Sequence, residues 1–286
     1  MVRIFTDTSA NLTPEIVKEY GITVVPFRYC VESEEHYAPS DDSFDGPSFY
    51  RAMENGAVVK TSMINAFAYC DAFEKAAAAG DDILYIGMSS GISGSFMESL
   101  VAVNDLRERY PKLRIAAVDT RAASLGEGLQ VIYAAELAKN GASFEEIYEK
   151  TLELSDHICQ YFTVSDLEYL RRGGRLSRIT SVVGNMLNIK PLLMGSDEGK
   201  IVLFHKVRGR KRSLDALADQ YRELVRDTAS PVGIAHAACA EDAAYLETKL
   251  RAYGCTGEVT TVWYEPVTGS HVGPGTVALF FYGIHR

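Results

Sequence analysis

No apolar run in this chain approaches the ~20 residues that a transmembrane helix requires. The N-terminal MVRIFTD leads directly into a predicted strand, so we expect no signal peptide. Cysteine is scarce and odd in number, and the absence of any CxxC pair predicts reduced thiols, a cytoplasmic location and no metal site. No GxxxxGKS or GxxxxGKT sequence occurs, which excludes a kinase-type phosphate loop. The cysteines are Cys30, Cys70, Cys159, Cys239 and Cys255.

Composition is that of a globular chain, with 47% hydrophobic and 23% charged residues among 286, which is long enough for two domains. The net charge of −9 argues against nucleic acid as a partner. Its distribution is uneven, because residues 171–212 hold 11 of the 29 basic but only 2 of the 38 acidic residues. A basic segment on an acidic body indicates an anionic ligand or an acidic partner surface, unless these cations only solvate the surface.

Apolar runs alternate with helical patterns in the first half of the chain. A capping residue followed by proline at Thr13-Pro14 starts one helix, and others are predicted over 67–79, 95–110 and 122–139. This alternation predicts a mainly parallel sheet flanked by helices, with ligands beyond the carboxyl ends of the strands. The predicted strands are VRIFTD, ITVVPFRY, ILYIGM and RIAAVD.

The pattern changes after residue 155. The turn SDEGK joins two apolar runs as a hairpin, and helices are predicted over 214–226 and 242–253. The predicted strands are HICQYFTV, PLLMG, KIVLFHKV, PVGIAHAA, EVTTVWYE and TVALFFYG. We therefore expect an α/β protein of two domains, 1–155 with a mainly parallel sheet and 156–286 with a mixed, partly antiparallel sheet and helices.

The stretch MSSGISGSF (88–96) places four serines and two glycines between a predicted strand and a predicted helix. Its GISGS resembles the GxSxG nucleophile elbow, although Ser95 stands at the last glycine position, and His271 would be the available base. A glycine-rich turn that opens a helix can instead bind an anion through N–H groups and hydroxyls. A turn with a purely structural role has the same composition, so the stretch alone leaves three alternatives.

Three further stretches favour an anion. Lys60-Thr61-Ser62 offers hydroxyls just before a predicted helix, and Gly269–Gly275 places His271 in a glycine-rich loop. The stretch 169–177 supplies guanidinium groups suited to carboxylate or phosphate. Taken singly, each also has an ordinary structural explanation: a helix cap, a loop histidine bound to backbone, or arginines paired on the surface.

Together and in this order, these stretches resemble the DegV family of bacterial fatty-acid-binding proteins, over essentially the whole chain. Eight matches in register make the resemblance specific. They are FTDTSANLT (5–13), KTS (60–62), SSGISGSF (89–96), DTRAASLGEG (119–128), YLRRGGRLS (169–177), NIKPLL (188–193), KVRGRKRSL (206–214) and HVGPGTVALFF (271–281).

The resemblance implies two α/β domains with a long-chain fatty acid in a tunnel between them, no other cofactor and no catalytic residue. The protein would present the carboxylate to a separate fatty acid kinase, which forms acyl phosphate for phospholipid synthesis. The carboxylate ligands carried over are Thr61, Ser93 and His271. Further head-group or loop contacts would be Ser62, Gly94, Ser95 and Arg171. The basic segment from Arg171 to Arg212 would hold the added charge of the acyl phosphate or dock the kinase. Partner docking would fall to Arg172, Lys206, Arg208, Arg210, Lys211 and Arg212, with no nucleic acid partner and at most transient contact with a membrane surface.

The chain departs from the family pattern after KTS, where Gln and Pro are replaced by Met63-Ile64-Asn65-Ala66. We expect apolar stretches such as Val182-Val183-Gly184-Asn185-Met186-Leu187 to line the tunnel, with methionine adapting to a flexible tail. Two other functions stay open: a serine esterase or thioesterase that uses Ser93 and His271, and a regulator that binds a phosphate ligand at the serine turn.

Overall fold

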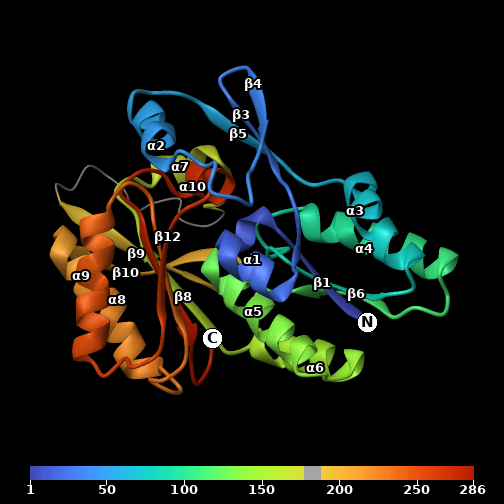
Figure 1. Ribbon diagram of the computed structural model, residues 1–286. Coiled ribbons are helices and arrows are strands. Elements are labelled where there is room, and N and C mark those ends of the chain that lie inside the picture. Colours follow the sequence, from blue (N-terminus) through green and yellow to red (C-terminus); the bar gives the residue numbers. More distant parts are fainter. Residues whose placement is uncertain (177–187) are drawn as a thin grey trace.

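The computed structural model describes residues 1–176 and 188–286, whose strands form three sheets (Figure 1). The first sheet has the order β2-β1-β6-β7 and is parallel throughout. Its two central strands are buried over four residues of β1 and five of β6, as expected when helices cover both faces of a parallel sheet. The strands are β1 (Val2–Asp7), β2 (Thr23–Val25), β6 (Asp82–Gly87) and β7 (Ile115–Asp119).

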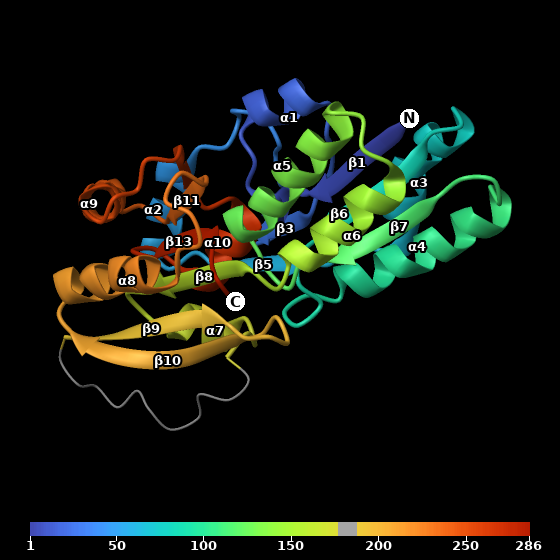
Figure 2. The same ribbon diagram turned by 90° about the horizontal axis from the view of Figure 1, so that it is seen from below.

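Helices cover both faces of this sheet (Figures 1 and 2). One face packs against α3 and α4 through residues such as Phe73 and Leu106, and the opposite face packs against α1, α5 and α6. The helices are α1 (Pro14–Tyr20), α3 (Ala66–Ala78), α4 (Ser95–Arg109), α5 (Leu125–Lys139) and α6 (Phe144–Leu154). The sequence prediction of a parallel, helix-flanked sheet is confirmed.

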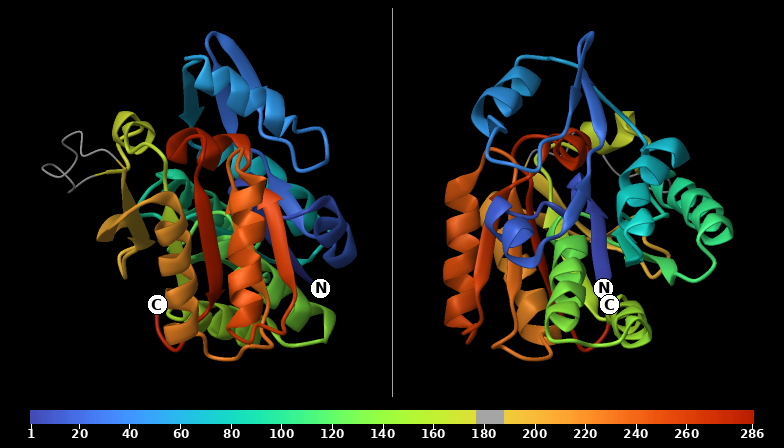
Figure 3. Two further views of the ribbon diagram at one scale, coloured as in Figure 1. Left: turned by 90° about the vertical axis from the view of Figure 1, so that its left-hand side faces the viewer. Right: turned by 45° about the vertical axis from the view of Figure 1, so that its right-hand side comes forward.

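The second sheet has the order β10-β9-β8-β13-β11-β12, in which only β11 and β12 are parallel neighbours. Helices α8 and α9 cover one face of it (Figure 3). The predicted mixed sheet and its β9–β10 hairpin are therefore confirmed. The elements are β8 (Ile158–Thr163), β9 (Ile189–Gly195), β10 (Ile201–Arg208), β11 (Val232–His236), β12 (Val259–Trp263), β13 (Val277–Tyr282), α8 (Arg210–Leu224) and α9 (Ala240–Ala252).

Helix α5 joins the two sheets. Its Val131 and Ala134 pack with the first sheet, whereas Leu125 and Leu129 pack with strands of the second. A helix buried on two sides needs apolar residues around most of its circumference, and LGEGLQVIYAAELAK meets this requirement. Each sheet thus packs against a different side of α5.

The predicted strand ITVVPFRY is divided in the structure. Pro26 separates β2 from β3 (Arg28–Val31), which belongs to an antiparallel sheet of order β4-β3-β5. Proline cannot donate the ladder hydrogen bond, so a strand is readily interrupted there. The third sheet is completed by β4 (Glu34–Tyr37) and β5 (Val59–Ser62), with α2 (Gly46–Glu54) between them. This excursion of the chain positions Thr61.

The predicted loop 269–275 begins instead as part of helix α10 (Pro266–Val272). Glu265 caps this helix, because its carboxylate accepts hydrogen bonds from the N–H groups of Val267 at 2.6 Å and Thr268 at 2.5 Å. Helix α7 (Glu168–Arg172) packs beside α10. The capping residue followed by Pro266 was the signal for this helix in the sequence.

The expected domain boundary at residue 155 falls between α6, which packs on the first sheet, and β8, which belongs to the second. The division into two domains stays a prediction. Within residues 1–176 and 188–286, no helix has the length and apolarity to cross a membrane, and no group of three or more His, Cys, Asp or Glu side chains could hold a metal ion. All five cysteine thiols are free.

Candidate functional site

A cavity of about 270 Å³ brings together residues that lie far apart in the sequence. Thr61 and Ser62 reach it from the end of β5, Ser93 and Gly94 from the turn between β6 and α4, and His271 from the last turn of α10. The three principal predicted head-group residues, Thr61, Ser93 and His271, therefore line one space, which we call the acyl cavity.

Thr61 and His271 are joined directly, with Oγ1 of the threonine 2.9 Å from Nε2 of the histidine. Burial, together with the positive charge of Arg175, lowers the pKa of His271 from 6.5 to about 4. The imidazole is thus uncharged at neutral pH and serves as a hydrogen-bonding group. Gly173 packs so closely on this ring that a Cβ atom there would overlap Nδ1 of His271. Nothing in the sequence singled out Gly173, because its role depends on contact with a residue 98 positions further along the chain.

Ser93 is held by its neighbour Ser95. The Ser93 hydroxyl lies 3.0 Å from that of Ser95 and accepts the N–H of Ser95 at 3.2 Å. Ser95 is fully buried and also accepts the N–H of Ile64 at 3.1 Å, so it supports the site from behind and does not line the cavity. The Ser93 hydroxyl donates to that of Ser95, so donation to a ligand oxygen requires the Ser93 hydroxyl to rotate away from Ser95.

The amides of the serine turn are largely committed within the turn itself. The N–H of Gly91 bonds to the Ser89 hydroxyl, and those of Ile92 and Ser93 bond to the Ser89 carbonyl. An anion site made of several free amides, one alternative raised by the sequence, is therefore not what the turn offers. Its contribution to the cavity is the side-chain hydroxyl of Ser93.

The other end of the serine turn contacts the β9–β10 hairpin. The Ser89 hydroxyl donates to the Gly199 carbonyl at 2.8 Å. A Cβ atom at Gly91 would collide with the backbone of Glu198 and Gly199. The serine and glycine at these two positions thus fit the hairpin against the first sheet, which is a structural role.

Arg171 and Arg175 have different places. Arg171, an expected head-group contact, is exposed, forms a bidentate ion pair with Glu168 at 2.5 and 2.6 Å, and does not line the acyl cavity. Arg175 does line it, and its guanidinium donates to the carbonyls of Ile92 at 3.0 Å and Gly173 at 2.5 Å. The stretch YLRRGGRLS contained this arginine, but spacing alone could not tell which guanidinium turns inward.

The expected docking residues lie on β10, α7 and the start of α8. Arg210 is half-buried and pairs with Asp242 at 2.8 Å, so its charge is used within the fold. Arg172 lies over the ring of Tyr169, with its Cζ 4.8 Å from the ring centroid. Exposed positions are occupied by Lys206, Arg208, Lys211 and Arg212. Like charges of this kind also protect an edge strand such as β10 from pairing with another chain.

The walls of the acyl cavity are apolar away from its hydroxyls. Phe27, Met88, Ile92, Leu170 and Val267 are among the lining residues. A second, smaller cavity of about 50 Å³ has Ile92, Ile201, Thr268 and Val272 in common with it, and continues between residues of the two sheets. Phe162 and Phe280 line that continuation. The stretch 182–187, predicted to line a tunnel, lies outside the described residues.

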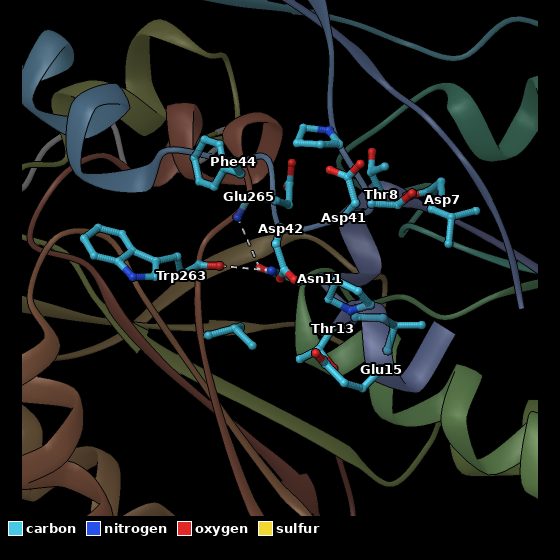
Figure 4. A pocket seen from close by; sticks show the side chains of 16 residues that line it. Asp7, Thr8, Asn11, Thr13, Glu15, Asp41, Asp42, Phe44, Trp263 and Glu265 are labelled. Carbon is cyan, nitrogen blue, oxygen red and sulfur yellow. Dashed lines mark hydrogen bonds between the residues drawn. The ribbon is translucent and has the colours of Figure 1, made fainter. Parts of the chain in front are cut away.

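A different pocket, of about 290 Å³, lies at the N-terminal end of α10 (Figure 4). Its lining is strongly acidic and we call it the acidic pocket. Asn11 lies across it and donates to the carbonyl of Trp263 at 2.9 Å. Burial, with a contribution from the charge of Asp7, raises the pKa of Glu265 from 4.5 to about 7. The carboxyl groups that line this pocket belong to Asp7, Glu15, Asp41, Asp42 and Glu265.

Comparison with known proteins gives consistent matches over nearly the full length of the chain. The family model described as "Uncharacterised protein, DegV family" matches residues 1–283. A DegV domain-containing protein of Clostridium perfringens is 38% identical over 281 residues, which cover 98% of this chain and 97% of the relative.

Two solved structures show the same fold. The fatty acid binding DegV family protein of Streptococcus agalactiae is 28% identical, with a TM-score of 0.86 and 98% of each chain covered. DegV of Bacillus subtilis, a fatty acid binding protein, is 27% identical, with a TM-score of 0.84 and again 98% of each chain covered.

Proposed function

This chain belongs to the DegV family, and from that premise we propose that it binds a long-chain fatty acid. The carboxylate lies against Thr61, Ser93 and His271, and the tail occupies the acyl cavity and its continuation between the sheets. The observation that carries this proposal is the convergence of these three polar side chains on one cavity whose walls also include Phe27, Met88, Leu170 and Val267. The solved relatives that bind fatty acids support it by fold and by family.

The energetics of such a ligand divide between tail and head group. Burial of an acyl chain of about sixteen carbons is worth roughly 0.8 kcal/mol per methylene, or about 10 kcal/mol. A hydrogen bond from a hydroxyl adds about 0.5–1.5 kcal/mol, and more when the acceptor is a carboxylate. The tail therefore sets the affinity, and the hydroxyls set where the carboxylate lies.

We further infer that the protein is a non-catalytic, cytoplasmic subunit that presents this carboxylate to a separate kinase, which forms acyl phosphate for phospholipid synthesis. Support comes from the site itself, because Thr61 and Met63 line the cavity and 53% of Met63 is exposed. The basic residues of β10 and α8 suit an acidic partner surface.

The esterase alternative needs His271 to act as a base for Ser93. In the structure, Nε2 of His271 bonds to Thr61, while the Ser93 hydroxyl bonds to Ser95. The lowered pKa of His271 also makes it a weak base. We therefore expect no turnover of ester or thioester substrates and no labelling by a serine-reactive phosphonate. Stoichiometric labelling of Ser93, with loss of a measured esterase rate, would restore the hydrolase.

The decisive experiment is native mass spectrometry of the purified protein, followed by lipid extraction. A bound long-chain fatty acid is expected, because a buried apolar tail dissociates slowly. Delipidated protein should then bind hexadecanoic acid and not butanoic acid in calorimetry. Equal affinity for the two acids would overturn the proposal, and preferential binding of inorganic phosphate would favour a phosphate-binding regulator.

A further inference from the structure

A further cavity, of about 380 Å³, borders the acyl cavity. The two cavities have Thr61, Arg175 and His271 in common, so the predicted carboxylate position lies between them. Tyr169, Gly173 and Ser270 line the remainder, together with residues at the start of β5. We call this space the outer chamber.

The outer chamber is cationic. Lys60, Arg172 and Arg175 line it, and none of its described lining residues is Asp or Glu. Within the described ranges Lys60 forms no ion pair, and Arg172 is 3.9 Å from a Glu168 carboxylate that Arg171 already holds at 2.5 Å. The positive charge at Lys60 and Arg172 is therefore only weakly compensated, whereas Arg175 is the single cation among the described residues that line the acyl cavity.

The reaction that we propose for the partner enzyme adds a phosphoryl group to the carboxylate, and this group needs a binding space of its own. A carboxylate oxygen attacks the terminal phosphorus of a nucleoside triphosphate, the bond from that phosphorus to the bridging oxygen breaks, and the nucleoside diphosphate leaves. The carboxylate, with one negative charge, becomes an acyl phosphate with two, and no proton is taken up or released. The added phosphoryl group must lie beyond the carboxylate, in a space that tolerates a dianion.

The geometry points to the outer chamber as the phosphoryl site, in which Lys60 and Arg172 bind the phosphate of the acyl phosphate while the tail remains in the acyl cavity. This inference rests on the proposed function. It assigns Lys60 a role that the sequence did not suggest, and of the two roles expected for the basic segment it gives Arg172 that of binding the phosphate. Arg175 lies at the boundary, where it neutralises charge in both spaces.

The test compares two ligands with the same tail, hexadecanoic acid and a stable oxoalkyl phosphonate in which a methylene replaces the anhydride oxygen of the acyl phosphate. The variant is Lys60→Ala/Arg172→Ala, at two positions whose side chains are exposed. The control is Lys112→Ala/Arg226→Ala, which removes the same charge at exposed positions outside both cavities. Affinities are measured by calorimetry at two salt concentrations.

We expect the variant to bind the phosphonate at least tenfold more weakly, with a smaller dependence on salt, and to bind hexadecanoic acid within twofold of the unchanged protein. The control should bind both ligands normally. The assignment of the outer chamber as the phosphoryl site would be overturned by equal losses for the two ligands or by no loss for either. It would also be overturned if the unchanged protein bound the acid but not the phosphonate. Failure of the unchanged protein to bind the acid would instead overturn the proposed function.

Discussion

The acidic pocket and the acyl cavity lie at opposite ends of the same short helix and are of similar size, about 290 and 270 Å³. Helix α10 gives Glu265 to the first and His271 to the second. Carboxyl groups surround the acidic pocket, whereas the described lining of the acyl cavity contains none and includes Arg175. These charges disfavour a carboxylate ligand in the acidic pocket and are compatible with the carboxylate position proposed in the acyl cavity.

The comparison shows that cavity size and strand-end position are poor guides to the binding site in this fold. Both pockets adjoin carboxyl ends of neighbouring parallel strands, β1 for the acidic pocket and β6 for the acyl cavity. What separates them is the sign of the charge and the apolar wall beside the polar groups, since a fatty acid needs both at once.

The largest effect should follow from placing a carboxylate in the acyl cavity. In Ser93→Asp, the introduced carboxylate would repel the carboxylate of the ligand. Two such charges about 4 Å apart repel by about 4 kcal/mol at an effective dielectric constant of about 20. We expect hexadecanoic acid affinity to fall more than 100-fold. Ser40→Asp adds the same charge at an exposed position in the acidic pocket and should change affinity by less than twofold. Similar losses in both variants would show that the two pockets are not distinct in function.

Removal of single hydroxyls should have the next largest effect. Ser93→Ala and Thr61→Ala each remove a donor worth about 1–3 kcal/mol toward a carboxylate, while the ~10 kcal/mol from the tail remains. Affinity should fall by about one or two powers of ten. Acyl phosphate formation with the partner kinase should fall further, since positioning dominates phosphoryl transfer. Ser40→Ala is the matched control, and unchanged values in both assays for Ser93→Ala would return the serine turn to a structural role.

The two ends of α10 should give opposite pH dependences of stability. The pKa of Glu265 is raised to about 7 in the folded protein. Its contribution to the free energy of unfolding is therefore complete below pH 4.5 and is lost as the pH rises to 7. The pKa of His271 is lowered to about 4, so the unfolded chain takes up the proton first and stability is lost as pH falls from 6.5. Between pH 4.5 and 6.5 the two slopes, each about 1.4 kcal/mol per pH unit, oppose each other.

Variants separate these slopes. In Glu265→Gln the free energy of unfolding, measured with urea, should rise with pH across this window relative to the unchanged protein. In His271→Gln it should fall with pH on the same scale. Slopes that do not differ between the two variants would mean that neither group titrates in the folded state as its surroundings indicate.

The smallest effect on fatty-acid affinity is expected from the exposed basic residues of β10 and α8. Charge reversal at Lys206, Arg208, Lys211 and Arg212 should leave hexadecanoic acid affinity within twofold, because exposed charges are screened over about 10 Å at 0.1 M salt. At low salt, acyl phosphate formation with the partner kinase should be slower in the variant than in the unchanged protein. At high salt, the difference between the two proteins should become smaller. Arg210 is left unchanged, because its reversal would break the ion pair with Asp242. Loss of fatty-acid binding with normal acyl phosphate formation would place this surface at the ligand.

The type and order of most long elements could be predicted from the sequence, because period-two and helical patterns report burial of each segment on its own. The divided strand at Pro26 and helix α10 could not, although Pro26 itself and the Glu265-Pro266 cap carried the necessary signals. Short elements bury too few residues for periodicity to be visible. The resemblance named Thr61, Ser93 and His271, and the structure brings them to one cavity, but their contact with a ligand stays a proposal.

By itself the sequence determined that MSSGISGSF joins a strand to a helix, and that cations gather in one segment of an acidic chain. Only the tertiary structure decided what each serine does: Ser89 holds the β9–β10 hairpin, Ser95 holds the backbone at Ile64, and Ser93 faces the cavity. It likewise turned Arg175 inward and joined Thr61 to His271 across 210 positions. Local patterns report which side of a segment is buried, whereas the partner of a polar group depends on the path of the whole chain.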